Sequence, residues 1–265
     1  MKHIARKRFG QNFLTDSQVL SDIIQTIAPA RSDTMVEIGP GLGAMTRLLL
    51  DGLDQLHVVE LDRDLVVRLQ KTFDPKKLLI HSGDALQFDF GALPVPTGKK
   101  LRVVGNLPYN ISSPLLFHLA QFTSQIQDQH FMLQKEVVER MVSPPGGKSY
   151  GRLSVMLQWR YTMELRFIVP PTAFDPPPRV ESAIVRMVPI ASPLACPQQA
   201  LEQVVLKAFS QRRKVIRNCL AGLFTEADLI DAGIDPQTRP ETVALEQFVA
   251  LANRLPTSGS DCAFR

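Results

Sequence analysis

The chain has 265 residues, of which 45% are hydrophobic, and a formal net charge of +4 at pH 7. This length suits one large domain or a medium domain plus a small one. No apolar run approaches the roughly 18 residues of a membrane span, and no apolar segment of a signal peptide follows the basic N-terminus. The 3 cysteines and 5 histidines lack the spacing of metal ligands or of a disulfide framework. We therefore expect a cytoplasmic protein that binds neither a metal nor a membrane.

The first predicted element is a helix, because Thr15 and Gln18 have the spacing of a capping box, with Thr15 as the N-cap. Strands are then predicted at 34–38, 56–61, 78–81, 101–105 and 130–133, and helices at 44–53, 63–72, 114–122, 135–142 and 152–161. Alternation at this spacing predicts an α/β fold with a mostly parallel, doubly wound sheet. Two late apolar runs, 165–169 and 183–188, predict strands that extend the sheet antiparallel at its edge.

Three closely spaced prolines, Pro189, Pro193 and Pro197, interrupt this pattern. Prolines at such density are typical of a linker, so we predict a domain boundary there. The prediction is a first domain over 1–190 and a small all-helical domain over 191–265. Within the second domain, the apolar spacing predicts helices at 199–209, 212–223, 226–232 and 242–255.

A glycine-rich string, Glu37-Ile-Gly-Pro-Gly-Leu-Gly43, ends the first strand and opens the next helix. Glycines permit a tight turn and let a ligand approach the backbone. With Ala44, the string also satisfies the dinucleotide-binding pattern. It therefore predicts a nucleotide-type ligand without choosing between NAD and S-adenosylmethionine.

Two acidic residues follow the next two strands. Glu60 ends the second strand, where a carboxylate can accept both ribose hydroxyls, and Asp84 follows the third, where it can accept the amino hydrogens of adenine. The plainer alternatives are a surface acid for Glu60 and a turn cap for Asp84.

The string Asn106-Leu-Pro-Tyr109 follows the fourth strand. Asn106 and a neighbouring carbonyl, that of Leu107, can accept hydrogen bonds from an amino group, and Tyr109 offers a face on which a planar base can stack. The alternative is a proline-containing turn with one aromatic ring in the core. A dehydrogenase needs neither this amide nor this ring, so the combination favours S-adenosylmethionine over a nicotinamide cofactor.

Positive charge is concentrated in two clusters. The first contains Lys2, Arg6, Lys7 and Arg8, and the second contains Arg212, Arg213, Lys214 and Arg217. Such clusters on a chain of pI 9.0 predict a polyanionic partner. We expect Arg6, Lys7 and Arg8 of the first cluster and all four residues of the second to bind RNA. Alternatively, the second cluster pairs with acids such as Glu202 or Glu226 and stabilises the helical domain.

The chain resembles the KsgA-type ribosomal RNA adenine-N6 dimethyltransferases over nearly its whole length. The resemblance rests on segments 37–43 and 211–218 and on three longer strings: Arg8-Phe-Gly-Gln-Asn-Phe-Leu14, Asn106-Leu-Pro-Tyr-Asn-Ile-Ser112 and Phe174-Asp-Pro-Pro-Pro-Arg-Val-Glu-Ser182. It implies a class I S-adenosylmethionine-dependent methyltransferase fold, which is Rossmann-like. It also implies cofactor contacts from Asn12, Leu14, Gly39, Glu60, Asp84 and Asn106. Phe174 is implied to stack on the face of the target base opposite Tyr109.

The implied substrate is a pair of adjacent adenines in a hairpin near the 3′ end of small-subunit ribosomal RNA, each dimethylated late in assembly by a monomeric enzyme. Val215 and Cys219 depart from the small polar residues expected in the basic helix. Three alternatives stay open. They are a resistance-type large-subunit RNA methyltransferase, a non-catalytic ribosome-assembly factor on the same fold, and a nicotinamide oxidoreductase.

Overall fold

The computed structural model describes residues 12–211 and 213–256, and the chain divides into two compact units. The first unit comprises Met1–Glu139 and Tyr161–Pro189, and the second comprises Arg140–Arg160 and Ile190–Arg265. The predicted first domain included residues 140–160, which the structure places in the second unit. The reason is packing within that unit, where the helix Arg152–Gln158 contacts the helix Gln198–Phe209.

The first unit is built on a seven-stranded sheet with the strand order β4-β3-β2-β5-β6-β9-β7. In this order the strands are Leu78–Ser82, Leu56–Glu60, Thr34–Ile38, Leu101–Asn106, Ile126–Gln134, Ser182–Pro189 and Tyr161–Val169. The strands from β4 to β6 are parallel, whereas β9 is antiparallel to both β6 and β7. The prediction of a mostly parallel sheet with an antiparallel extension is therefore confirmed. Strands β6 and β7 begin four residues earlier than predicted, at Ile126 and Tyr161.

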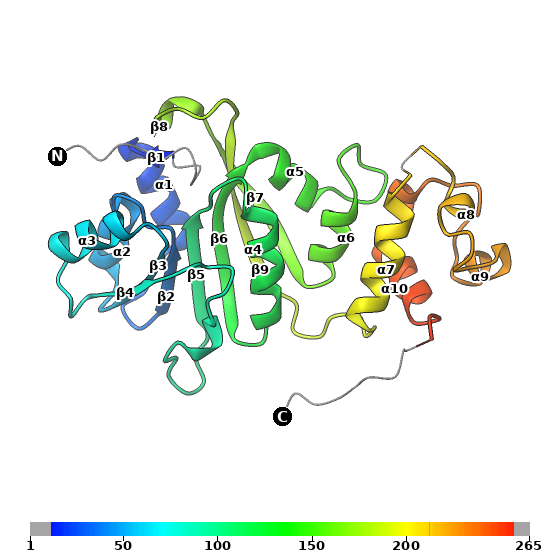
Figure 1. Ribbon diagram of the computed structural model, residues 1–265, viewed down its shortest axis with the longest axis horizontal. Coiled ribbons are helices and arrows are strands. Elements are labelled where there is room, and N and C mark those ends of the chain that lie inside the picture. Colours follow the sequence, from blue (N-terminus) through cyan, green and yellow to red (C-terminus); the bar gives the residue numbers. More distant parts are fainter. Residues whose placement is uncertain (1–11, 212, 257–265) are drawn as a thin grey trace. The chain divides into compact units, whose positions relative to one another are not determined.

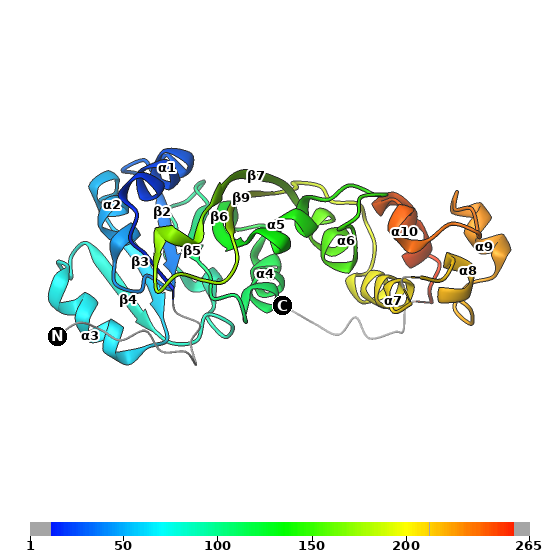
Figure 2. The same ribbon diagram turned by 90° about the horizontal axis from the view of Figure 1, so that it is seen from above.

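Helices cover both faces of this sheet. One apolar core joins the sheet to α1 (Ser17–Ile27), α2 (Ala44–Gly52) and α3 (Arg63–Thr72). Figure 2 shows α4 (Ser112–Leu119) on the face opposite α1 and α2, and α5 (Lys135–Val142) follows β6. Short 3₁₀ segments lie at Phe90–Ala92, Ala120–Phe122 and Pro171–Ala173. No helix in residues 12–211 and 213–256 is long and apolar enough to span a bilayer.

The start of α1 differs from the predicted capping box. Asp16 is the N-cap, and its carboxylate accepts hydrogen bonds from the backbone N–H groups of Gln18 and Val19 at 2.9 and 3.0 Å. Thr15 does not cap the helix, because its backbone N–H and its hydroxyl both donate hydrogen bonds to the carbonyl of Ala173. The prediction of Thr15 as the cap was wrong because it ignored this distant partner.

A second, two-stranded sheet lies beside α1. Its strands are β1 (Phe13–Leu14) and β8 (Phe174–Asp175), which pair antiparallel and lie close together in Figure 1. The pairing brings the segment after residue 11 next to the proline-rich loop before β9. Two strings that carried the family resemblance are thereby in direct backbone contact.

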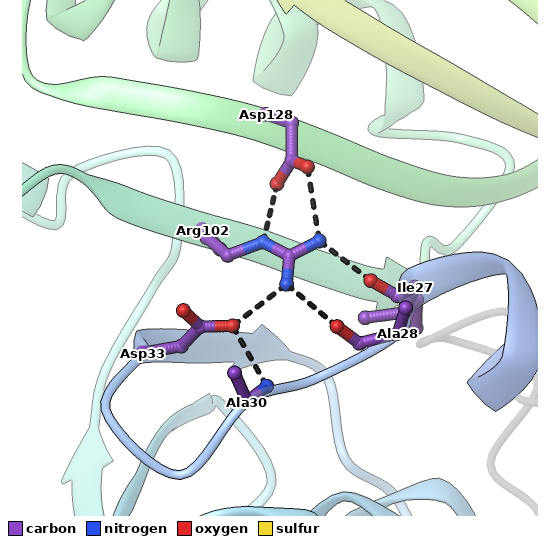
Figure 3. A network of polar contacts seen from close by, with 6 residues as sticks. All are labelled: Ile27, Ala28, Ala30, Asp33, Arg102 and Asp128. Atoms are coloured by element: carbon purple, nitrogen blue, oxygen red, sulfur yellow. Dashed lines mark hydrogen bonds and ion pairs between the residues drawn. The ribbon is translucent and has the colours of Figure 1, made fainter.

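The C-terminal end of α1 is attached to the sheet by a buried ionic network (Figure 3). Arg102 on β5 is 7% exposed and donates to both carboxylate oxygens of Asp128 on β6, at 2.8 and 2.9 Å. Its remaining donors contact Asp33 at 2.7 Å and the carbonyls of Ile27 and Ala28 at 2.6 and 3.2 Å. The last carbonyls of a helix lack partners within the helix, so Arg102 satisfies two groups that burial would otherwise leave unpaired.

The described part of the second unit is helical. It contains α6 (Arg152–Gln158), α7 (Gln198–Phe209), α8 (Ile216–Cys219), α9 (Glu226–Asp231), α10 (Leu245–Ala252) and a 3₁₀ segment at Pro240–Thr242. The predicted helix over 212–223 was wrong, since among the described residues 213–223 only the four residues Ile216–Cys219 are helical. Val215 is extended, and the N–H of Ile216 donates to the distant carbonyl of Thr238 at 2.7 Å, so the helix starts late. Gly222, at φ +80°, lies beyond its end.

Candidate active site

A pocket of about 360 Å³ opens at the carboxyl ends of the parallel strands of the first unit. Open α/β sheets bind their ligands at this edge. The six residues predicted to contact the cofactor all line it, namely Asn12, Leu14, Gly39, Glu60, Asp84 and Asn106. Leu107 and Tyr109 line the same pocket. Residues far apart in the sequence therefore line one pocket.

The glycine-rich loop after β2 forms one wall of the pocket. Gly39 and Gly43 have backbone φ values of +67° and +82°, which residues other than glycine rarely adopt. A Cβ at Gly43 would lie only 2.7 Å from the ring of Phe73 on the adjacent segment after α3. The loop therefore needs glycine at Gly43 both for its turn and for the close approach of α3.

Glu60 is held in the pocket wall by backbone donors. Its carboxylate accepts hydrogen bonds from the N–H groups of Asp62 at 2.9 Å and Gly41 at 3.3 Å. The residue is 7% exposed, and burial raises the pKa of its carboxyl above the ordinary value, although these backbone donors oppose the shift. The geometry excludes the alternative of a solvated surface acid and presents a fixed acceptor to the pocket.

Asp84 is half-buried and caps the turn that follows it, because its carboxylate accepts a hydrogen bond from the N–H of Leu86 at 2.9 Å. The turn-cap interpretation is therefore correct as a description of this contact. A carboxylate has several lone pairs, so the cap leaves acceptor capacity that faces the pocket. The cap and the proposed contact with adenine are compatible.

Asn106 ends β5, and its side-chain nitrogen donates to the backbone carbonyl of Asn12 at 3.1 Å. This bond fixes the amide plane, and no described residue donates to the side-chain oxygen. Leu107 is buried, and its N–H donates to the carbonyl of Met132 at 3.2 Å. The strand end is thus held rigidly, with one amide oxygen available to accept hydrogen bonds.

The two aromatic residues predicted to stack on a base differ in position. The hydroxyl of Tyr109 lies 2.7 Å from the hydroxyl of Ser182 on β9, and burial raises the pKa of the tyrosine. Phe174 is 4% exposed, belongs to the apolar core beside Ala173, and does not line the pocket. Tyr109 and Asn106 therefore line the same pocket, whereas Phe174 lies in the core. The stacking role of Phe174 stays a prediction for the RNA-bound protein.

Two buried polar residues that were not predicted from the sequence also line the pocket. Glu37 is 1% exposed and accepts a hydrogen bond from the hydroxyl of Thr46 at 2.6 Å, and burial raises its pKa to about 8. His130 is 3% exposed, and burial lowers its pKa to about 4. Glu37 is a polar residue in a mostly apolar strand, and His130 follows three polar residues of β6, and neither pattern gives information on the direction of the pocket.

The predicted RNA-binding residues fall into three groups. Arg6, Lys7, Arg8 and Arg212 lie outside the described residues. Arg213 and Lys214 are exposed in the second unit, before α8. Arg217 forms an ion pair with Glu226 at 3.2 Å, as the alternative reading of this cluster anticipated. No group of three or more metal-ligating side chains is found in the parts of the chain that the structure describes.

Comparison with known proteins covers nearly the whole chain. A family model described as "Ribosomal RNA adenine dimethylase" matches residues 2–256. Two curated relatives carry the name "Ribosomal RNA small subunit methyltransferase A". The protein from Herminiimonas arsenicoxydans is 80% identical over 255 residues, which cover 96% of this chain and 100% of the relative. The protein from Janthinobacterium sp. (strain Marseille) is 77% identical with the same coverage.

Solved structures show the same fold. A dimethyladenosine transferase from Plasmodium falciparum aligns with a TM-score of 0.75 and 24% identity, over 90% of this chain and 95% of that one. The 23S rRNA methyltransferase ErmE aligns with a TM-score of 0.70 and 26% identity, over 92% of this chain and 99% of that one. The class of fold expected from the sequence is confirmed.

Proposed function

Because this chain belongs to the ribosomal RNA adenine dimethylase family, we propose that it dimethylates the N6 amino groups of two adjacent adenines in 16S-type small-subunit RNA. The target is a hairpin near the 3′ end of that RNA in a late-assembly subunit, and the enzyme acts as a monomer in the cytoplasm. The observation that carries the proposal is the fixed amide of Asn106 in a pocket that Glu60 and Asp84 also line.

The pocket suits S-adenosylmethionine, which supplies a methyl group on a sulfonium centre. Glu60 would accept the ribose hydroxyls, and its backbone donors already hold it in place. Asp84 would accept the amino hydrogens of adenine, and the glycine loop leaves space for the ligand beside the backbone. The carboxylates that line the pocket are acceptors suited to the hydroxyl and amino groups of S-adenosylmethionine, and this match supports the proposed cofactor.

The adenine amino group is a poor nucleophile, because its lone pair is delocalised into the ring. Asn106 and the carbonyl of Leu107 would each accept one of its hydrogens, which favours a pyramidal nitrogen with its lone pair directed at the methyl group. The bond from Asn106 to Asn12 orients the amide before substrate arrives. Such preorganised acceptors lower the barrier because they need not reorganise during the reaction.

Tyr109 would receive the base after it leaves its stack. Its hydroxyl contact with Ser182 holds the ring at the pocket edge. Stacking of a base on an aromatic ring contributes about 1–3 kcal/mol, which offsets part of the cost of unstacking.

The large-subunit alternative has one observation in its favour, the likeness to the 23S rRNA methyltransferase ErmE at 26% identity. The relatives at 80% and 77% identity, which are named small-subunit methyltransferases, outweigh it. We therefore retain the small subunit as the proposed substrate.

A methyl-transfer assay tests the proposal. Small and large ribosomal subunits that lack the modification are incubated separately with the protein and S-adenosylmethionine, and their RNA is analysed by mass spectrometry. Dimethyladenosine at two adjacent positions of the small-subunit RNA is expected. Asn106→Ala should slow single-turnover methylation by about 10²–10³-fold. Methylation of the large-subunit RNA, or no methylation, would contradict the assignment.

A further inference from the structure

Tyr109 is attached to the protein both at its backbone and at the tip of its side chain. Its phenol hydroxyl lies 2.7 Å from the hydroxyl of Ser182. Its backbone carbonyl accepts a hydrogen bond from the hydroxyl of Ser112 at 3.1 Å. The N–H of Ile111 also donates to the carbonyl of Pro108 at 3.2 Å, which closes the turn that contains Tyr109. The tyrosine is therefore held in place before any ligand arrives.

Ser182 is itself fixed, because it belongs to the sheet. It is the first residue of β9, is fully buried, and pairs with Gln134 on β6 and Val169 on β7. Glu181, directly before it, is bound to Lys135 twice. Its carbonyl accepts the backbone N–H of Lys135 at 3.0 Å, and its carboxylate pairs with the ammonium group at 2.8 Å. The position of Ser182 is therefore determined by contacts with the strands on both of its sides.

The contact between Tyr109 and Ser182 crosses the edge of the sheet. Tyr109 follows Asn106, which ends β5, whereas Ser182 begins β9, and β6 lies between these two strands. Neighbouring strands are about 4.8 Å apart, so the phenol reaches from the loop after one strand towards the second strand beyond it. Ser182 pairs with Gln134, the last residue of β6. The ring therefore lies at the carboxyl end of β6, and Tyr109 lines the pocket from there.

The hydrogen bond to Ser182 restricts the side-chain torsions of Tyr109. Rotation about the Cα–Cβ bond would carry the phenol oxygen away from Ser182 and leave a fully buried hydroxyl without this partner. A buried polar group without a partner is costly, so the bond selects one orientation of the side chain. A base that stacks on a ring already held in place does not have to immobilise that ring, and binding is more favourable by the entropy saved.

We propose that Ser182 is a positioning residue for the methyl transfer, because its hydroxyl holds the ring of Tyr109 where the extruded target adenine stacks. The inference rests on the proposed function, since it takes Tyr109 as the residue that receives this base. Ser182 does not contact the base itself, because it is fully buried and does not line the pocket. It acts through the ring, and an error of about 1 Å in the placement of a reacting group can slow a reaction by about 10²-fold.

Single-turnover methylation of unmodified small subunits, with subunits and S-adenosylmethionine both saturating, tests this role with a pair of isosteric variants. Ser182→Thr keeps the hydroxyl, and Ser182→Val replaces it with a methyl group of similar size, so both add the same bulk to the buried site. The Val variant should be about 3- to 10-fold slower than the Thr variant, because the freed ring has to be immobilised again with each base. Both variants should bind S-adenosylmethionine in calorimetry within about twofold of each other, because the proposed cofactor contacts come from other residues.

A double-mutant cycle tests whether the two hydroxyls act as one unit. Ser182→Ala and Tyr109→Phe each remove the same bond, so the double variant should be no slower than the slower single variant. Ser182→Ala adds no bulk, so the cycle is decisive even if the larger residues do not fit. Tyr161→Phe is the matched control, because it removes a buried phenol hydroxyl that accepts a hydrogen bond from Gln129 at 3.0 Å and does not line the pocket. Its rate should equal that of the unmodified protein, and circular dichroism confirms that each variant is folded.

The outcomes separate the inference from the proposed function. If the unmodified protein methylates no adenine, the proposed function fails, and the role of Ser182 fails with it. If it methylates the small subunit but Ser182→Val is as fast as Ser182→Thr, only the positioning role is overturned. A double variant slowed by the product of the two single effects would also contradict the inference, because the two hydroxyls would then act independently. Equal slowing by Tyr161→Phe would mean that the loss of any buried hydroxyl slows the reaction, which would refute a specific role.

Discussion

Replacing Arg102 with methionine should destabilise the first unit more than any exposed charge substitution. The change removes every bond that Arg102 makes in Figure 3 and leaves Asp128, which is 3% exposed, as a buried carboxylate without a cation. It also leaves the carbonyls of Ile27 and Ala28 without the donors that Arg102 provides. Breaking a buried pair by removing one partner costs about 3–5 kcal/mol, and we expect a loss of this size.

Urea titration followed by circular dichroism measures the free energy of unfolding, and Arg31→Met is the matched control. Arg31 pairs with Asp54 at 3.3 Å, but both side chains are at least 70% exposed, so its loss should cost less than about 1 kcal/mol. The double variant Arg102→Met with Asp128→Leu should recover much of the stability, because it removes the unpaired charge. A difference below about 1 kcal/mol between the Arg102 and Arg31 variants would refute this reasoning.

The remaining predictions concern ligands and pH. Glu60→Ala should weaken S-adenosylmethionine binding by about 1–3 kcal/mol in calorimetry, and an unchanged affinity in a folded protein would remove Glu60 from the site. Burial raises the pKa of Glu37 from 4.5 to about 8, so the folded state holds this proton more tightly than the unfolded chain. Stability should therefore fall as pH rises between these two values, and Glu37→Gln should flatten that decline in urea titrations; an unaltered decline would mean that other groups cause it. Replacing Arg213 and Lys214 with Gln should reduce the slope of log affinity for RNA against log salt by about 0.7–0.9 per lost phosphate contact, whereas an unaltered slope would argue against such contacts.

Local sequence patterns predicted the sheet and most helices of the first unit. The helices Arg63–Thr72 and Lys135–Val142 have the predicted bounds, because each has its own apolar periodicity and terminating signals. The candidate site was predictable for a related reason. Residues that directly follow parallel strands must meet at one edge of the sheet, whatever the details of packing.

The errors arose where a distant partner decides the local structure. The helix expected over 212–223 is short because Ile216 is bonded to Thr238, and Thr15 is not a cap because it is bonded to Ala173. Phe174 and His130 show the same limit for side chains. Whether each side chain is buried, and whether it lines the pocket, depends on how several elements pack, which no single segment of sequence contains.

The pairing of β1 with β8 has a thermodynamic consequence for the coupling between the binding of the cofactor and the binding of the RNA. It joins Thr15 to Ala173, which are 158 positions apart, so the segment of Asn12 and Leu14 and the segment of Phe174 share one small sheet. A cofactor held by the first segment also restricts the backbone of the second, where the RNA base is expected. Ordering that either ligand completes need not be repeated for the other, so each should raise the affinity of the other by the same factor. Release of the cofactor product after methyl transfer would then lower the affinity of the protein for the RNA.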